Sequence, residues 1–254
     1  MKIGIVCYPT FGGSGVLATE LGIELSKKGY EIHFITYNQP VKLELLSNKV
    51  HYHEVMVPDY PLFHYQPYEL ALSTKVVDMV KKHEIELLHV HYAIPHAYAA
   101  YMAKNMLKYE GINIPVVTTL HGTDITLVGS HPSYKAAVEF SINKSDAVTA
   151  VSESLKKDTE ELFSIDTNIE VIPNFINLEK YPLERKEKTR SIIAENDEKI
   201  ICHISNFRKV KRIDDVINIF YNINKKIPSK LMMVGEGPEK VNAEKLCKKL
   251  KIKD

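Results

Sequence analysis

The sequence carries almost no net charge. Its 33 lysines and arginines are nearly balanced by 32 aspartates and glutamates, which leaves a formal net charge of +1 at pH 7. A protein that binds nucleic acid or an acidic membrane surface through its overall field has a larger excess of positive charge. We therefore predict no nucleic-acid partner and no membrane partner, and local basic runs need separate interpretation.

Cysteines are also scarce. The three, Cys7, Cys202 and Cys247, are far apart, and none forms a C-x-x-C pair. This number and spacing are typical of a protein kept reduced in the cytoplasm, where a cysteine is usually a small core residue. The sequence thus predicts neither a disulfide framework nor a cysteine metal site.

Long apolar runs are absent. No segment approaches the roughly 20 apolar residues that cross a bilayer, and Met1-Lys2 leads directly into a strand-like run rather than a signal peptide. We therefore expect a soluble, cytoplasmic protein. Its 254 residues, 44% of them hydrophobic, suffice for one large core, or for one full domain and part of another.

Short β-rich runs alternate with amphipathic helical stretches along the first two thirds of the chain. Leu17, Leu21 and Leu25, for example, recur at helical spacing and form one apolar stripe. The alternation predicts an α/β fold with a mostly parallel sheet and right-handed crossovers. The predicted strands are 2–7, 31–36, 50–57, 85–90, 115–119, 147–151 and 169–172, and the predicted helices are 15–28, 68–83, 96–108, 133–143 and 153–163.

This rhythm breaks near residue 175. A charged stretch without an apolar period, 184–190, follows, and then the alternation of strand and helix restarts. We therefore predict two doubly wound domains, 1–174 and 175–254. The second has only two predicted strands, a thin core for a domain, so we expect it to be incomplete. Its predicted elements are strand 199–204, helix 212–226, strand 230–234 and helix 239–250.

A glycine-rich loop, with Ser14 between Gly13 and Gly15, follows the first predicted strand. Glycines let the backbone approach a ligand, and the N-terminus of the next helix offers N–H groups to an anion. Residues 13–18 also fit the G-x-G-x-x-A pattern of dinucleotide-binding proteins. However, five residues separate the motif from its strand, and the second strand ends without an acid to hold a ribose. We favour an anion or acceptor cradle, with a structural turn and a dinucleotide site as alternatives.

Histidines gather at the ends of two other predicted strands. His89 and His91 end one, and the segment 119–124 ends the next, so their side chains are expected to converge at one edge of the sheet. The His-x-His spacing raises the question of a metal, but no acid or cysteine lies nearby in the sequence, and we predict none. The alternatives are a hydrogen-bonded cap on the strand ends and a site for a polyhydroxylated substrate, which we favour for His121 and Asp124.

A basic loop follows the first strand of the second domain. Arg208 and Lys211 lie three residues apart where the loop enters a helix, so both can reach one diphosphate. The alternative is a solvated helix start, which is unfavourable because positive charge opposes the helix dipole unless an anion offsets it. We predict a phosphate site here. Further on, Gly237 either serves only to form a tight turn or lets the backbone contact a nucleotide base.

Taken together, these loops resemble the retaining glycosyltransferases of family 4, which have the two-domain GT-B fold. Arg208 and Lys211 match the Arg-x-x-Lys pair of that family. The family also carries two glutamates eight positions apart late in the second domain, and this sequence has no assignable counterpart. The resemblance implies two Rossmann-like domains, the second incomplete. The stretches that carry it are 7–9, 12–15, 89–96, 119–126 and 203–212.

The resemblance also implies an activity. The enzyme would transfer N-acetylglucosamine from UDP-N-acetylglucosamine to the hydroxyl of L-malate, the first step of bacillithiol biosynthesis, without a metal or other cofactor. The alternatives are a related enzyme with another small acceptor such as an inositol phosphate or a sugar, a nicotinamide-dependent oxidoreductase and a non-catalytic nucleotide-sugar binder; a homo-oligomer is left open. The implied residues are catalytic Arg208, Lys211 and His121, donor-binding Gly13, Asp124, Asn206 and Gly237, and acceptor-binding Ser14, Gly15, Tyr92 and Thr119.

Overall fold

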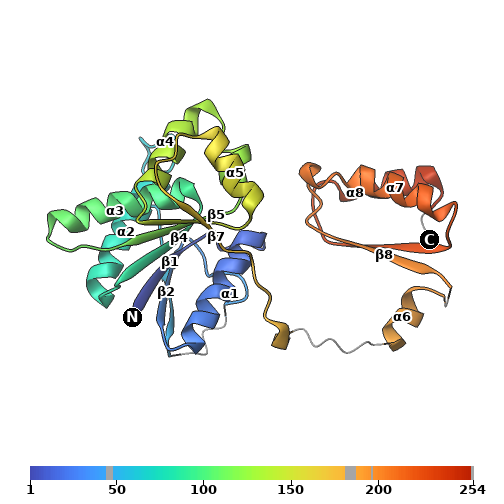
Figure 1. The fold of residues 1–254 in the computed structure, drawn as a ribbon, viewed down its shortest axis with the longest axis horizontal. Helices are drawn as coiled ribbons and strands as arrows, with labels where there is room; N and C mark the ends of the chain where they lie inside the picture. The colour runs from blue at the N-terminus through green and yellow to red at the C-terminus, as the bar shows by residue number, and fades with distance from the viewer. Residues whose placement is uncertain (44–47, 181–186, 196, 253–254) are drawn as a thin grey trace. The chain divides into compact units, whose positions relative to one another are not determined.

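The computed structural model describes residues 1–43, 48–180, 187–195 and 197–252. The chain forms two compact units, Met1–Ile176 and Asn177–Asp254 (Figure 1). The division falls two residues beyond the boundary that we placed after residue 174.

The first unit is built on a seven-stranded sheet. Its strands are β1 (Lys2–Val6), β2 (Glu31–Thr36), β3 (Val50–Glu54), β4 (Leu87–His91), β5 (Val116–Leu120), β6 (Ala147–Ala150) and β7 (Ile169–Val171). They lie in the order β3-β2-β1-β4-β5-β6-β7, and all neighbours are parallel. The order reverses direction between β1 and β4. This is the topological switch point, where open α/β sheets bind ligands beyond the carboxyl ends of the strands.

Helices cover both faces of this sheet. They are α1 (Gly13–Lys27), α2 (Tyr68–His83), α3 (Tyr98–Tyr109), α4 (Pro132–Asn143) and α5 (Glu153–Leu162). Successive residues of β1 point into opposite layers: Ile5 packs in the core beneath α1, and Val6 packs with Leu72 and Val76 of α2. The predicted doubly wound α/β fold is confirmed. No helix in the described part of the chain is both long and apolar enough to cross a membrane.

Several predicted boundaries differ in the structure by one to three residues, and two of these differences have a clear structural reason. The strand predicted at 50–57 stops at Glu54, because its one neighbour, β2, ends at Thr36, whose carbonyl accepts the last hydrogen bond from Val55. The helix predicted at 96–108 begins only at Tyr98. A wide irregular turn, η1 (Ala93–Ala97), precedes it and contains an extended residue that a helical pattern does not reveal.

The second unit contains a parallel pair of strands, β8 (Lys199–Ile204) and β9 (Ser229–Val234). Helix α7 (Ile213–Asn224) connects them, and α8 (Lys240–Leu250) follows β9. Phe207, Ile213 and Ile217 form their common core with Ala243. All four predicted elements are present, with ends within two residues of the prediction.

The beginning of the second unit contains a helix that was not predicted from the sequence. Within the charged stretch 184–190, residues 184–186 lie outside the described part of the chain. The rest belongs to α6 (Glu187–Ile193), which follows a 3-10 turn, η3 (Leu178–Lys180). The lack of an apolar period therefore did not exclude a short helix here.

Candidate functional site

Hydroxyl groups from three segments meet at the switch point of the first unit. Tyr92 follows β4, Thr123 follows β5, and Ser14 lies in the first turn of α1. Ser14 Oγ donates a hydrogen bond to Tyr92 Oη over 3.3 Å, and Tyr92 Oη lies 3.0 Å from Thr123 Oγ1. The predicted pair Ser14 and Tyr92 is thus brought together. Thr123 lies in the segment 119–124 that was expected to converge here, but no role was assigned to it from the sequence.

The backbone of Tyr92 is strained. Its φ of 87° and ψ of 133° are rare for a residue with a side chain. Such conformations cost on the order of 1–3 kcal/mol and persist where the surrounding structure imposes them, often at functional sites. Here Tyr92 N donates to Thr119 O over 3.0 Å, and the Tyr92 ring meets Tyr8 edge-on with 5.1 Å between centroids. The strain supports a functional role for this strand end.

The histidines beside this hydroxyl row form two largely buried hydrogen-bonded groups. His91 Nδ1 lies 2.9 Å from His121 Nε2, and His89 Nε2 lies 2.8 Å from Thr119 Oγ1. Thr119 Oγ1 in turn lies 2.8 Å from Thr149 Oγ1. Thr119 is only 8% exposed, so the structure places this predicted acceptor contact beneath the surface, where it orients His89.

Asp124 is buried at the centre of the strand ends, with 1% of its surface exposed. Its Oδ2 accepts the backbone N–H of Ala93 over 3.1 Å, and its Oδ1 accepts those of His121 and Gly122 over 3.1 and 2.9 Å. Burial raises the pKa of this carboxyl, and the hydrogen bonds oppose that rise. The predicted donor contact of Asp124 stays a prediction. In the structure its carboxylate holds the loops after β4 and β5 together.

Burial also controls the charge of the histidines. Desolvation lowers the pKa of His89, His96 and His121 to about 4 and that of His91 well below its ordinary value. Neighbouring rings lower the pKa of His91 and His121 further. At neutral pH these four rings are therefore uncharged. They serve as hydrogen-bonding groups and supply no positive charge to an anionic substrate.

We expect the first unit to lose stability as the pH falls from about 6.5 to about 4. In that range the four rings stay neutral in the folded state but take up protons on unfolding, because their unfolded pKa is near 6.5. The free energy of unfolding therefore decreases as the pH is lowered. Over this pH range the thermal midpoint should drop on the order of 10 °C. Circular dichroism melts measure it, and His121→Gln should give a shallower slope. A midpoint independent of pH would contradict neutral buried rings.

The two glycines of the α1 turn have different surroundings. A Cβ added at Gly15 would collide with the carbonyl oxygens of Tyr8 and Thr10, whereas one at Gly13 would meet no atom within 4 Å. The loop after β1 thus lies directly on Gly15. Packing alone requires glycine at position 15 but not at position 13.

We expect Gly15→Ala to lower the free energy of unfolding by about 1–3 kcal/mol, because a backbone contact has to move. Gly13→Ala is the matched control and should change it by less than about 0.5 kcal/mol. Urea denaturation of both variants measures the difference. Equal effects of the two substitutions would show that space beside Gly15 is not what matters.

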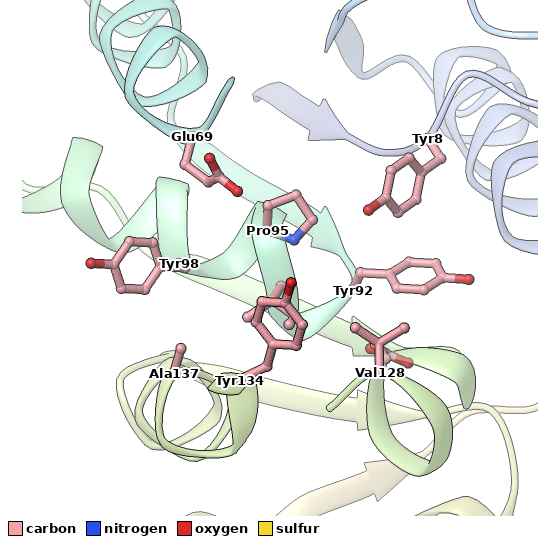
Figure 2. Close-up of a pocket in the computed structure, with 10 residues that line it drawn as sticks. Tyr8, Glu69, Tyr92, Pro95, Tyr98, Val128, Tyr134 and Ala137 are labelled. Atoms are coloured by element: carbon pink, nitrogen blue, oxygen red, sulfur yellow. The ribbon is translucent and has the colours of Figure 1, made fainter. Parts of the chain in front are cut away.

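Beside the hydroxyl row lies a pocket of about 440 Å³ (Figure 2). Most of its lining is aromatic or apolar, and Tyr8, Glu69 and Tyr134 add polar atoms from three separate segments. Burial raises the pKa of Tyr8 to about 12, so its phenol keeps its proton at neutral pH. Pockets of this size and composition bind small molecules. Of the lining residues, only Tyr92 and Asp124 were assigned a role from the sequence, although Tyr8, Ile94 and Pro95 lie in stretches that carry the family resemblance.

In the second unit the basic loop is exposed. Arg208 precedes a 3-10 turn, η4 (Lys209–Lys211), which Lys211 ends. Both side chains are exposed, as is Asn206. Among the residues that the structure describes, no carboxylate lies within 4.0 Å of the Arg208 or Lys211 head group. The two cations are therefore available to an anionic ligand.

Arg208 and Lys211 do not belong to the first turn of helix α7, which begins at Ile213. Its first turn contains Asp214 and Asp215, and its N-cap residue, Arg212, pairs with Asp215. The two carboxylates offset the helix dipole. Our argument that uncompensated positive charge at this helix N-terminus requires an anion is therefore wrong. The case for a phosphate site rests on the exposed head groups of Arg208 and Lys211 instead.

The glycine turn after β9 lies against the same loop. Gly237 has a φ of 156°, and a Cβ there would meet the backbone of Phe207 at 2.5 Å. Phe207 N donates to Glu236 O, and Glu239 N donates to Phe207 O, each over 2.9 Å. Gly237 thus has a packing role that needs no ligand, and its donor contact stays a prediction.

Two family models match the chain: Glycosyltransferase Family 4 over residues 11–180, and Glycosyl transferases group 1 over residues 184–254. N-acetyl-alpha-D-glucosaminyl L-malate synthase of Bacillus anthracis is 46% identical and covers 100% of this chain, which spans 66% of that protein. A putative teichuronic acid biosynthesis glycosyltransferase of Bacillus subtilis is 25% identical over 69% of this chain and 44% of its own length. The chain thus spans about two thirds or less of these relatives.

Solved structures agree on the fold. Sucrose-phosphate synthase from Thermosynechococcus elongatus has a TM-score of 0.72 at 17% identity, covering 99% of this chain and 68% of its own. Anabaena HepE in complex with UDP-glucose has a TM-score of 0.76 at 15% identity, covering 100% and 67%. A Rickettsia africae glycosyltransferase has a TM-score of 0.75 at 20% identity, covering 99% and 65%. The family model matches well over half of the sequence, and the chain belongs to glycosyltransferase family 4.

Proposed function

We propose that the protein transfers N-acetylglucosamine from UDP-N-acetylglucosamine to the hydroxyl of L-malate, with the α configuration retained, as the first step of bacillithiol biosynthesis. The observation that carries this proposal is the 46% identity, along the whole chain, to a protein named as the N-acetylglucosaminyl malate synthase of Bacillus anthracis. Fold alone would not distinguish one acceptor from another. The geometry of each unit supports a separate part of the reaction.

The first unit supports binding of the acceptor. Malate is a small dianion, so its site has to offer several oriented donors. The first turn of α1 offers the N–H groups of Gly13, Ser14 and Gly15, because its cap residue makes no side-chain hydrogen bond to them. We assign a malate carboxylate to this turn and the reacting hydroxyl to the row formed with Tyr92 and Thr123. Thr123 takes the contact first predicted for Thr119, which is buried.

The second unit supports binding of the donor diphosphate. Arg208 and Lys211 are exposed and can neutralise charge that develops as UDP leaves, the kind of electrostatic stabilisation that often dominates catalysis. Elsewhere Mg²⁺ commonly has this task, and we propose that the two cations replace it here. Asn206 and the Gly237 backbone complete the assigned donor contacts on this unit.

The surroundings of the Asp124 carboxylate favour attack by the acceptor on the same face of the sugar that UDP leaves. Asp124 already accepts three backbone hydrogen bonds in a buried position, which makes it a poor nucleophile for a double displacement. We infer that malate oxygen attacks the anomeric carbon as the bond to the diphosphate breaks, and that a phosphate oxygen of departing UDP takes the hydroxyl proton. His121, uncharged at neutral pH, holds a sugar hydroxyl, and Asp124 orients the loop that carries it.

Composition supports the proposed location and the proposed class of ligands. Cys7 and Cys202 are free thiols, which fits the cytoplasmic location that we propose. The substrates are small molecules, and the near-zero net charge gives no field for nucleic acid.

An acceptor panel tests this function. The protein is incubated with UDP-N-acetylglucosamine and, separately, with L-malate, D-malate, an inositol phosphate and glucose, and released UDP is measured. We expect release that depends on L-malate. UDP release that depends on the inositol phosphate instead would reassign the acceptor within the same family. UDP release at the same rate with every acceptor, or with none, would contradict the assigned malate site.

A further inference from the structure

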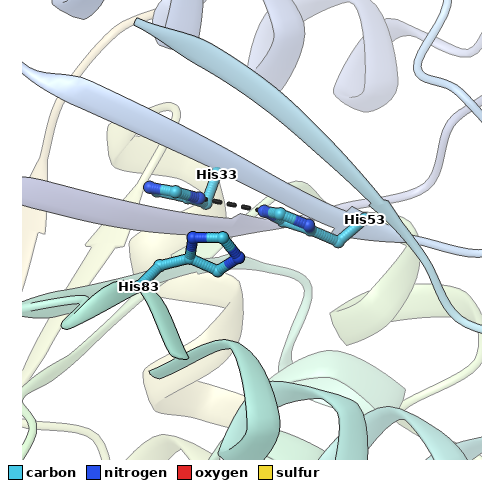
Figure 3. Close-up of side chains that lie close together, drawn as sticks. All are labelled: His33, His53 and His83. Carbon is cyan, nitrogen blue, oxygen red and sulfur yellow. Dashed lines mark hydrogen bonds between the residues drawn. The ribbon is translucent and has the colours of Figure 1, made fainter. Parts of the chain in front are cut away.

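A second histidine cluster lies in the first unit, outside the residues assigned to glycosyl transfer. It consists of His33 in β2, His53 in the edge strand β3 and His83 at the end of α2 (Figure 3). His33 Nδ1 lies 2.9 Å from His53 Nε2, and both ring centroids lie 4.8 Å from that of His83. Three segments that are distant in sequence thus bring three imidazoles together.

The burial of these rings calls for a reason. His33 is fully buried, and His53 and His83 are half-buried. An apolar side chain would fill these places without the cost of desolvating ring nitrogens. Side chains alternate along β3, so His53 shares a face of the strand with His51. The structure shows that the alternation directs it toward His33.

The spacing of the ring nitrogens suits a metal ion. One nitrogen from each of the three rings lies within 4.8 Å of the other two. Zinc binds imidazole nitrogen at about 2.0–2.1 Å, so two nitrogens on a tetrahedral ion are roughly 3.3 Å apart. The His33–His53 pair, at 2.9 Å, would have to open only by roughly 0.4 Å on this estimate.

A carboxylate lies on the far side of His33. His33 Nε2 is 3.3 Å from Glu31 Oε1, and the same oxygen is 3.1 Å from His51 Nε2. A histidine that binds metal through one nitrogen typically directs its other N–H to a carboxylate, which fixes the ring. Among the described residues, no group yet completes a regular hydrogen bond with His33 Nε2. A small rotation on metal binding would complete the one to Glu31.

We propose that His33, His53 and His83 bind one divalent transition-metal ion of the zinc, nickel and copper group, which prefers imidazole ligands. His33 binds through Nδ1 and keeps its proton on Nε2, and His53 binds through Nε2 and keeps its proton on Nδ1. The C-terminus of α2, where His83 lies, adds partial negative charge. The ion ties the edge strand β3 and the end of α2 to β2, a structural role separate from glycosyl transfer.

Zn²⁺ titration by calorimetry, with the visible d–d absorption of Co²⁺ as a second probe, tests the proposal. We expect one ion per chain with a Kd below about 10 μM, and a thermal midpoint that rises with added metal. His83→Gln and His53→Gln should each weaken binding by about tenfold or more. Melts without metal establish that both variants fold.

Matched controls locate the ion. His64 is an exposed histidine outside the cluster, and Cys202 is an exposed thiol, so His64→Gln and Cys202→Ser should leave binding unchanged. His121→Gln removes the strand-end histidine pair and should also leave it unchanged. The proposal is overturned if the protein binds neither Zn²⁺ nor Co²⁺, if folded His83→Gln and His53→Gln bind as tightly as the parent, or if binding is lost in any control.

Discussion

Replacing Arg208 or Lys211 by alanine is expected to lower kcat about 100-fold or more, with a smaller change in the KM for the donor. The reason is that a charge-stabilising group acts mainly on the transition state, where the negative charge on the departing diphosphate is greatest. Both head groups are exposed and lack a carboxylate within 4.0 Å in the part of the chain that is described. Steady-state UDP release measures both parameters.

Lys209→Ala is the matched control for this pair. Lys209 belongs to the same turn and is also exposed, but it lines a hollow together with Asp214, Asp215 and Glu239. Its loss should change kcat by less than about threefold. Unchanged turnover in Lys211→Ala would contradict the assigned pair. An equal loss in Lys209→Ala would show that the general positive charge of the loop, and not a specific pair, explains the effect.

Asp124→Ala is expected to lower the free energy of unfolding of the first unit by about 3–5 kcal/mol. Its carboxylate accepts the backbone N–H groups of Ala93, His121 and Gly122 in a buried position. Each buried donor left without a partner costs about 1–3 kcal/mol, and partial relaxation reduces the sum. Urea denaturation gives the free energy, and the thermal midpoint should fall on the order of 10 °C.

Two further variants isolate the cause. Asp124→Asn should be destabilising as well, because its amide nitrogen has to face one of the same N–H donors. Asp78 is an exposed aspartate on α2, and Asp78→Ala should change the free energy by less than about 0.5 kcal/mol. A stability of Asp124→Ala within about 1 kcal/mol of the parent would contradict the assigned role of the carboxylate.

Local patterns were sufficient to predict the fold, but not all of its boundaries. Alternating β-rich and helical runs predicted the parallel sheet, because its strands are covered on both faces and leave an apolar signature. The end of β3 was missed because it depends on where its neighbour β2 stops. The start of α3 was missed because η1 (Ala93–Ala97) has no periodic pattern.

The part of the candidate site that lies at the converging ends of the strands could be predicted from the sequence. Ser14 and Tyr92 lie together as expected, because the carboxyl ends of parallel strands share one edge. Sequence does not show whether a polar side chain there faces a ligand or a neighbouring backbone, which is why the burial of Asp124 and Thr119 was not foreseen. The cluster of His33 with His53 and His83 was missed for another reason, since it depends on strand pairing and not on motif spacing.

The structure of the product is the most direct test of N-acetylglucosaminyl transfer to malate. The protein is incubated with UDP-N-acetylglucosamine and L-malate, and the reaction is followed by NMR and mass spectrometry. We expect UDP and an α-linked N-acetylglucosaminyl malate in equal amounts. A β-linked product, free N-acetylglucosamine alone, or a sugar left on an acceptor other than malate would contradict the proposed transfer.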